Sequence, residues 1–152
     1  MRLADVLKIE AIRTDLSAKD KESTLRALAR IFAESDCVLD EESVYRAFSD
    51  REALATTGLG SGVAIPHGRV DTDQFRVVIA ISPEGVPFDS IDGQPAHIVF
   101  AVLGPVQNPA DQLRMLARIS RVLKDQSVRR RLLAATSSED ALKIVIEEEL
   151  RH

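Results

Sequence analysis

Three short runs of apolar and β-branched residues in the middle of the chain constrain its fold more than any other feature. They cover residues 63–65, 77–82 and 98–103, and turn-forming stretches at 83–85 and 92–93 bound them. Short apolar runs between Pro, Gly and Asp residues are typical of strands buried in a sheet. The middle of the chain is therefore predicted to form a β-sheet.

Helical periodicity flanks these strands on both sides. A capping Ser17 with an acid three positions on, followed by apolar residues at helical spacing, predicts a helix from about residue 18 to 34. Further helices are predicted to start at Asp40, Asn108-Pro109, Asp125 and Ser138. With residues 12–16 as one more candidate strand, the order of elements indicates an α/β fold with a mixed sheet.

Composition restricts the class of protein. The 152 residues suffice for one domain, 1–152, and 45% hydrophobic with 29% charged residues are typical of a soluble globular chain. The net charge of −4 predicts no nucleic-acid partner. The single cysteine, Cys37, excludes an internal disulfide and favours a reducing compartment, the cytoplasm. The start MRLADVLKIE has no signal-peptide core, and no run of about 18 apolar residues predicts insertion into a membrane.

The stretch GSGVAIPHGR, residues 60–69, contains the most informative of the three histidines. Pro66 restricts the chain before His67, and Gly68 is expected to allow an unusual backbone after it, where a short strand ends. A rigidly held, exposed imidazole can accept a phosphoryl group, act as a base or bind a metal. An ordinary turn histidine without a role is the alternative.

The other two histidines do not complete a metal site. His97 opens a predicted strand and His152 is the last residue, so no clustered ligand spacing accompanies His67. We therefore expect no metal and no cofactor.

The glycine-rich stretch 58–62 is predicted to bind an anion through its backbone. It follows a helix and precedes a strand, which is the reverse of nucleotide-binding loops, and Ser61 lacks the context of a hydrolase nucleophile. Glycines nevertheless let backbone N–H groups turn toward an anion. The residues expected to form a phosphate-binding loop are Thr57, Gly58, Gly60, Gly62 and Gly68.

Two further side chains are candidates for the same site. Arg51 shares a helical face with Val44, Phe48 and Ala55, which predicts a guanidinium on a buried stripe, where it would bind a phosphate or form a structural ion pair. Gln112 lies in the first turn of the helix after Asn108, whose free N–H groups can face an anion. A glutamine that merely caps the helix or lines the core edge is the alternative.

These motifs resemble those of a known family. Arg51-Glu52-Ala53-Leu54 followed by TTGLGSGVAIPHG, residues 56–68, resembles the signature of type-2 EIIA domains of the phosphoenolpyruvate:sugar phosphotransferase system. The stretch FDSIDGQP, residues 88–95, is more similar to the nitrogen-regulatory (PtsN, EIIA-Ntr) branch than to the fructose and mannitol branches. The resemblance covers essentially the whole chain. It implies the mannitol-type fold, a mixed sheet flanked by helices on both faces.

The resemblance also implies an activity. His67 would receive a phosphoryl group from a phosphorylated HPr-like (NPr) carrier protein, and Arg51 would steady the phosphate beside it. Members of the family usually carry a second active-site histidine in an H-L-x-x-L segment, whereas residues 112–116 here read QLRML. Gln112 therefore stands at the position of that histidine, and onward transfer of the phosphate is in question.

Three functions follow as hypotheses. The first is a phosphocarrier in a signalling phosphorelay, in which the state of His67 controls binding to a regulated protein such as a kinase or a transporter. The second is a sugar-permease component that passes phosphate onward to an EIIB acceptor. The third is a binding module in which His67 is vestigial. A chain without fused permease domains favours signalling.

Overall fold

The centre of the sheet is a long antiparallel pair, β5 (Arg76–Val86) and β6 (Ala96–Pro105). In this computed structural model, which describes all 152 residues, the strand order is β1-β5-β6-β3-β2. β1 (Ile12–Arg13) is parallel to β5, and β2 (Gly58–Gly60) is antiparallel to β3 (Val63–Ala64). The predicted mixed sheet is confirmed, and β2 is a strand in the glycine-rich stretch that the sequence predicts as a loop.

β3 and β4 (His67–Val70) follow each other along the same edge of β6. Both run parallel to it, with Val63 opposite Ile98 and His67 opposite Val102. The predicted strand 63–65 corresponds to β3, and β4 is a further strand that the sequence did not predict. Pro66 lies at the interruption, since a proline has no N–H to donate to the ladder, but its carbonyl still accepts a 2.9 Å bond from the Val102 N–H.

Five helices of eight residues or more surround the sheet. They are α2 (Lys21–Ser35), α3 (Glu41–Leu54), α4 (Pro109–Leu123), α5 (Gln126–Leu133) and α6 (Ser138–Glu149). All five were predicted, but α2 starts later than expected, because Asp20 and not Ser17 accepts the capping bond, from the Ser23 N–H at 2.7 Å. The short helices α1 (Leu3–Val6) and η1 (Ile9–Ala11) were missed, since three or four residues show no periodicity.

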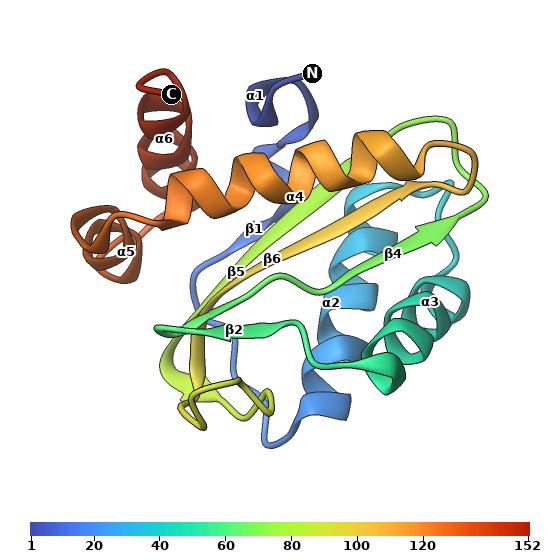
Figure 1. The fold of residues 1–152 in the computed structure, drawn as a ribbon, viewed down its shortest axis with the longest axis horizontal. Coiled ribbons are helices and arrows are strands. Elements are labelled where there is room, and N and C mark those ends of the chain that lie inside the picture. The colour runs from blue at the N-terminus through green and yellow to red at the C-terminus, as the bar shows by residue number, and fades with distance from the viewer.

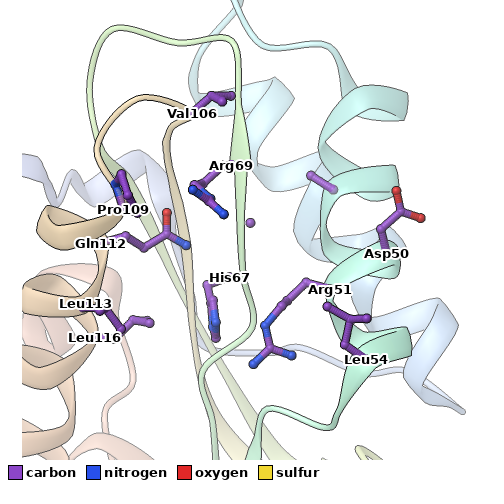
Figure 2. Close-up of a pocket in the computed structure, with 12 residues that line it drawn as sticks. Asp50, Arg51, Leu54, His67, Arg69, Val106, Pro109, Gln112, Leu113 and Leu116 are labelled. Carbon is purple, nitrogen blue, oxygen red and sulfur yellow. The ribbon is translucent and has the colours of Figure 1, made fainter.

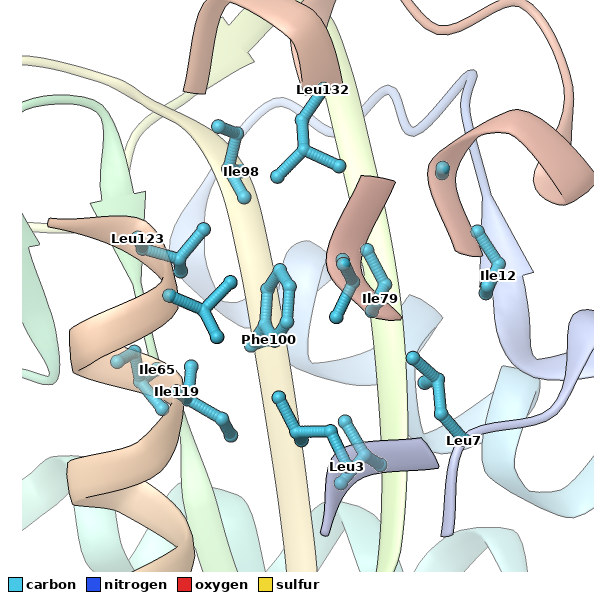
Figure 3. Close-up of a cluster of buried hydrophobic side chains, with 14 of the residues drawn as sticks. Leu3, Leu7, Ile12, Ile65, Ile79, Ile98, Phe100, Ile119, Leu123 and Leu132 are labelled. Carbon is cyan, nitrogen blue, oxygen red and sulfur yellow. The ribbon is translucent and has the colours of Figure 1, made fainter. Parts of the chain in front are cut away.

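The helices form two layers with the sheet between them. Figure 1 shows α2 and α3 on one face and α4 crossing the other, with α1, α5 and α6 on the side of α4. Side chains alternate along β6, so that Phe100 joins the cluster beneath α4 (Figure 3) and Ala101 joins the cluster beneath α2 and α3. Both faces of the central strands are buried, which explains why they read as continuous apolar runs. None of the helices combines the length and apolar character needed to cross a bilayer.

Candidate functional site

A cavity of about 670 Å³ opens where the two helical layers meet at the edge of the sheet. Its walls come from α3, β4 and the first turns of α4 (Figure 2). Its polar lining consists of Asp50, Arg51, His67, Arg69 and Gln112. The structure thus brings together the three side chains that the sequence analysis selected from distant segments.

His67 presents one free ring nitrogen to this cavity. Its Nδ1 lies 2.8 Å from the carbonyl oxygen of Ile65. Because a carbonyl only accepts hydrogen bonds, Nδ1 carries the hydrogen and Nε2 keeps its lone pair in the neutral ring. His67 is the first residue of β4, whereas the sequence predicts it at the end of a strand. The half-buried imidazole is consequently held at both its backbone and its ring.

The surroundings of His67 favour the neutral imidazole. Burial lowers the pKa of His67 below the usual value of 6.5, and the positive charge of Arg51 lowers that pKa further. The hydrogen bond to Ile65 and the negative charge of Glu52 act in the opposite direction, without reversing the shift. At pH 7 the ring is therefore neutral, which is the nucleophilic form.

Gly68 serves packing and not an unusual backbone. The glycines with positive φ are Gly60, Gly62, Gly85 and Gly93, so the expectation for Gly68 is wrong. A Cβ on Gly68 would lie 3.1 Å from the Cβ of Ala47 on α3, closer than most such contacts. The missing side chain lets α3 approach β4, which brings Arg51 close to His67.

Arg51 lies at the end of α3 with its guanidinium toward the cavity. It is half-buried, its Nη1 donates to the Ala55 carbonyl oxygen at 3.0 Å, and no acid pairs with it. Val44 and Phe48 are buried as predicted, but Ala55 is exposed beyond the helix end, so the buried stripe continues at Glu52 instead. The structural ion pair considered for Arg51 is absent, which leaves its guanidinium available to an anion.

Gln112 is buried, with 6% of its surface exposed, in the first turn of α4. Its Oε1 is buried without a hydrogen-bond partner, and a Cβ on Gly104 would come within 2.7 Å of that oxygen. Figure 2 shows the amide group on the His67 side of α4. The glutamine therefore lines the cavity and does not cap the helix.

The glycine-rich stretch lies elsewhere. Gly58 and Gly60 belong to β2, and the turn at Ser61 and Gly62 leads into β3. Ser61 N–H donates to the Asp92 carboxylate at 2.9 Å, so this hairpin packs against the loop before β6. Of the five residues expected to bind phosphate, only Gly68 lines the cavity of His67. The remaining four, Thr57, Gly58, Gly60 and Gly62, are not brought to it.

Thr57 instead takes part in a buried polar network that the sequence analysis missed. The carboxylate of Glu52, 9% exposed, accepts from the Thr57 N–H at 3.0 Å and from its hydroxyl, and pairs with Lys21 Nζ at 2.6 Å. The Thr57 carbonyl in turn accepts from the Ile65 N–H at 3.0 Å. The network therefore fixes the residue whose carbonyl orients His67. The only signal of this network in the sequence is that Glu52 follows Arg51. No local pattern connects Glu52 with Lys21, which lies 31 positions earlier.

The family follows from comparison of the whole chain. The family model described as phosphoenolpyruvate-dependent sugar phosphotransferase system, EIIA 2, matches residues 5–148. The chain belongs to this family. The type-2 EIIA domain is 33% identical over 149 residues to a "Nitrogen regulatory protein" of Klebsiella oxytoca, covering 97% of this chain and 91% of that protein.

Two further relatives show the range of the family. A "PTS system fructose-specific EIIA component" of Haloferax volcanii is 32% identical to this EIIA domain over 146 residues, covering 95% of each chain. The solved nitrogen regulatory protein IIA-Ntr of Neisseria meningitidis superposes with a TM-score of 0.87 at 29% identity, covering 94% of this chain and 98% of that one. The fold implied by the resemblance is confirmed.

The first prediction concerns the buried network. Glu52→Ala in the EIIA domain should lower the free energy of unfolding by about 3–5 kcal/mol, because it leaves the partly buried Lys21 and the Thr57 donors without their acceptor. Urea unfolding followed by circular dichroism measures the change. Glu42→Ala is the matched control, since Glu42 pairs with Arg26 at 2.7 Å on the surface, and it should change stability much less. Equal effects of the two substitutions would contradict the network.

The second prediction concerns the titration of His67. Its imidazole should titrate below pH 6.5 in an NMR titration, with Nδ1 protonated in the neutral ring. Arg51→Gln should raise the pKa, because a nearby positive charge disfavours the imidazolium. Since the unfolded state binds the proton more readily, His67 should also make stability fall as the pH drops through 6.5. Titration at or above 6.5, or a neutral ring protonated on Nε2, would disprove this description.

Proposed function

We propose that this EIIA-type phosphocarrier accepts a phosphoryl group on Nε2 of His67 from a phosphorylated HPr-like (NPr) protein and acts mainly as a regulatory signal in the cytoplasm. The observation that carries the proposal is the geometry of His67, whose imidazole is held through Nδ1 and whose Nε2 is free, in an open cavity beside an arginine that has no acid partner. A metal or a cofactor has no part in the proposed step.

The proposed transfer is balanced in atoms and electrons. The lone pair of His67 Nε2 forms a new P–N bond, while the P–N bond of the donor phosphohistidine breaks and its electron pair stays on the donor nitrogen. His67 need not lose a proton, because Nε2 carries none. Positive charge shifts to the accepting ring, where the Ile65 carbonyl stabilises the Nδ1–H.

Arg51 is proposed to bind the phosphoryl oxygens during transfer. Its planar guanidinium presents paired donors that match two oxygens of a phosphate. The Ala55 carbonyl holds the group at the end of α3 before the substrate arrives. A donor that is positioned in advance costs little reorganisation during the reaction.

Regulation and sugar transport remain distinct candidates. The similarity to a nitrogen regulatory protein supports the first, and the nearly equal similarity to a fructose-specific EIIA component supports the second. Gln112 favours regulation, because an amide can donate a hydrogen bond to a departing phosphoryl group but never carries positive charge. The regulated protein would be a kinase or a transporter that distinguishes the two states of His67.

The third prediction tests acceptance of the phosphoryl group. With phosphoenolpyruvate, enzyme I and an HPr-type carrier, the wild-type chain should gain one acid-labile phosphate, and His67→Ala should gain none. Arg51→Ala should slow the transfer on the order of 10²–10³-fold, and Arg51→Lys should restore it only in part. His152→Ala is the control and should be labelled normally. Phosphate mapped to His97 or His152, or an unchanged rate in Arg51→Ala, would refute the assignments.

The fourth prediction separates signalling from sugar transport. Phosphorylated wild-type chain should pass its phosphate to fructose- and mannitol-type EIIB acceptors slowly, and Gln112→His should speed this step, because an imidazolium can neutralise the transferring oxygens. Loss of phosphate from the pre-phosphorylated chain after mixing measures the rate. Rapid transfer by the wild type that the substitution does not change would favour the permease component.

A further inference from the structure

A second arginine, Arg69, lines the cavity of His67. Arg69 lies two residues after His67 on β4, so both side chains leave the same face of the strand. Both line the cavity, with Arg69 on the side toward Val106 and Arg51 across from Gln112 (Figure 2). Two guanidinium groups on different elements thus share one cavity with the accepting imidazole.

The guanidinium of Arg69 has no partner within the chain. Several arginines elsewhere pair with carboxylates, as Arg26 does with Glu42 and Arg76 with Asp36. The exposed side chain of Arg69 forms no hydrogen bond and no ion pair, although an exposed carboxylate, Asp50, lines the same cavity. A guanidinium that is free at the wall of a cavity is available to an anion that enters it.

The buried amide of Gln112 brings no positive charge to the cavity wall opposite Arg51. It is neutral at every pH, and His67 is neutral at pH 7. A phosphoryl group in transfer carries about two negative charges, spread over its oxygens. Arg51 alone would balance about one of them, and the carboxylate of Asp50 adds a further negative charge at the rim. A second cation at the wall of the cavity would therefore stabilise the transferring oxygens better than Arg51 alone.

We propose that Arg69 binds the oxygens of the phosphoryl group as it reaches His67, and that it supplies the positive charge which the neutral Gln112 cannot. Arg69 is then a second phosphoryl-binding residue of the cavity, together with Arg51. This inference rests on the proposed acceptance of phosphate by His67. It also gives the chain a way to stabilise the transfer without a second imidazole.

The test compares Arg69→Ala and Arg69→Lys with the wild type in single-turnover transfer from a phosphorylated HPr-type carrier. The rate is measured over a range of carrier concentrations, which separates the saturating rate from the half-saturating concentration. Arg121→Ala is the matched control, because Arg121 is exposed and lacks an ion pair but lies at the far end of α4, outside the cavity. The same substitutions are repeated in the Gln112→His chain.

Arg69→Ala should lower the saturating rate on the order of tenfold or more, with little change in the half-saturating concentration. Arg69→Lys should keep part of the rate, since it retains the charge but not the planar fork. Arg121→Ala should match the wild type. In the Gln112→His chain the loss caused by Arg69→Ala should be smaller, because the new imidazole can supply charge.

Three results would overturn the inference. The first is an unchanged rate in Arg69→Ala, and the second is a rise only in the half-saturating concentration, which would make Arg69 a contact for the carrier. The third is an equal loss of saturating rate from Arg69→Ala in the wild-type and Gln112→His chains, which would show that Arg69 does not compensate for the neutral Gln112. A wild-type chain that accepts no phosphate at all would instead refute the proposed function, and the inference would fall with it.

Discussion

The hydrogen bond from His67 Nδ1 to the Ile65 carbonyl is the interaction on which the site depends. It fixes the tautomer, and with it the ring nitrogen that faces the cavity. Ile65 is itself held by Thr57, and Thr57 is held by the buried pair of Glu52 and Lys21. A salt bridge between α2 and α3 is thereby connected, through Thr57 and Ile65, to the orientation of a histidine on β4. Loss of this network should lower the stability of the chain and leave the imidazole of His67 without a fixed orientation.

The sheet explains why the cavity lies where it does. β4 has only β6 as a neighbour, so its other side is an edge at which the layer of α3 and the layer of α4 come close. A backbone edge in this position is free of ladder partners, and the helices supply side chains around it from both faces (Figure 1). Gly68 permits the close approach of α3, and Gly104 leaves room for Gln112. Rigid elements on three sides can thus hold Arg51, His67 and Gln112 without a mobile loop.

Local signals predicted most of the fold and the principal residues. Strong apolar runs gave β5 and β6, and helical spacing gave all five longer helices, because their burial follows directly from the pattern. The strands β2 and β4 depend on pairing with distant segments, which no local pattern contains. The sequence suggests that Gly68 provides an unusual backbone conformation, whereas in the structure its lack of a side chain allows close contact with Ala47. Glu52 and Arg69 were missed because their roles depend on neighbours that only the fold brings near.

The position of the P–N bond is the most direct test of phosphoryl acceptance on Nε2 of His67. The chain, labelled with ¹⁵N in its histidines, would be phosphorylated through enzyme I and an HPr-type carrier and then observed by ¹⁵N and ³¹P NMR. We expect a single phosphohistidine at residue 67, with phosphorus bonded to Nε2 and the hydrogen still on Nδ1. Phosphorus bonded to Nδ1 of His67, or to any other residue, would contradict it.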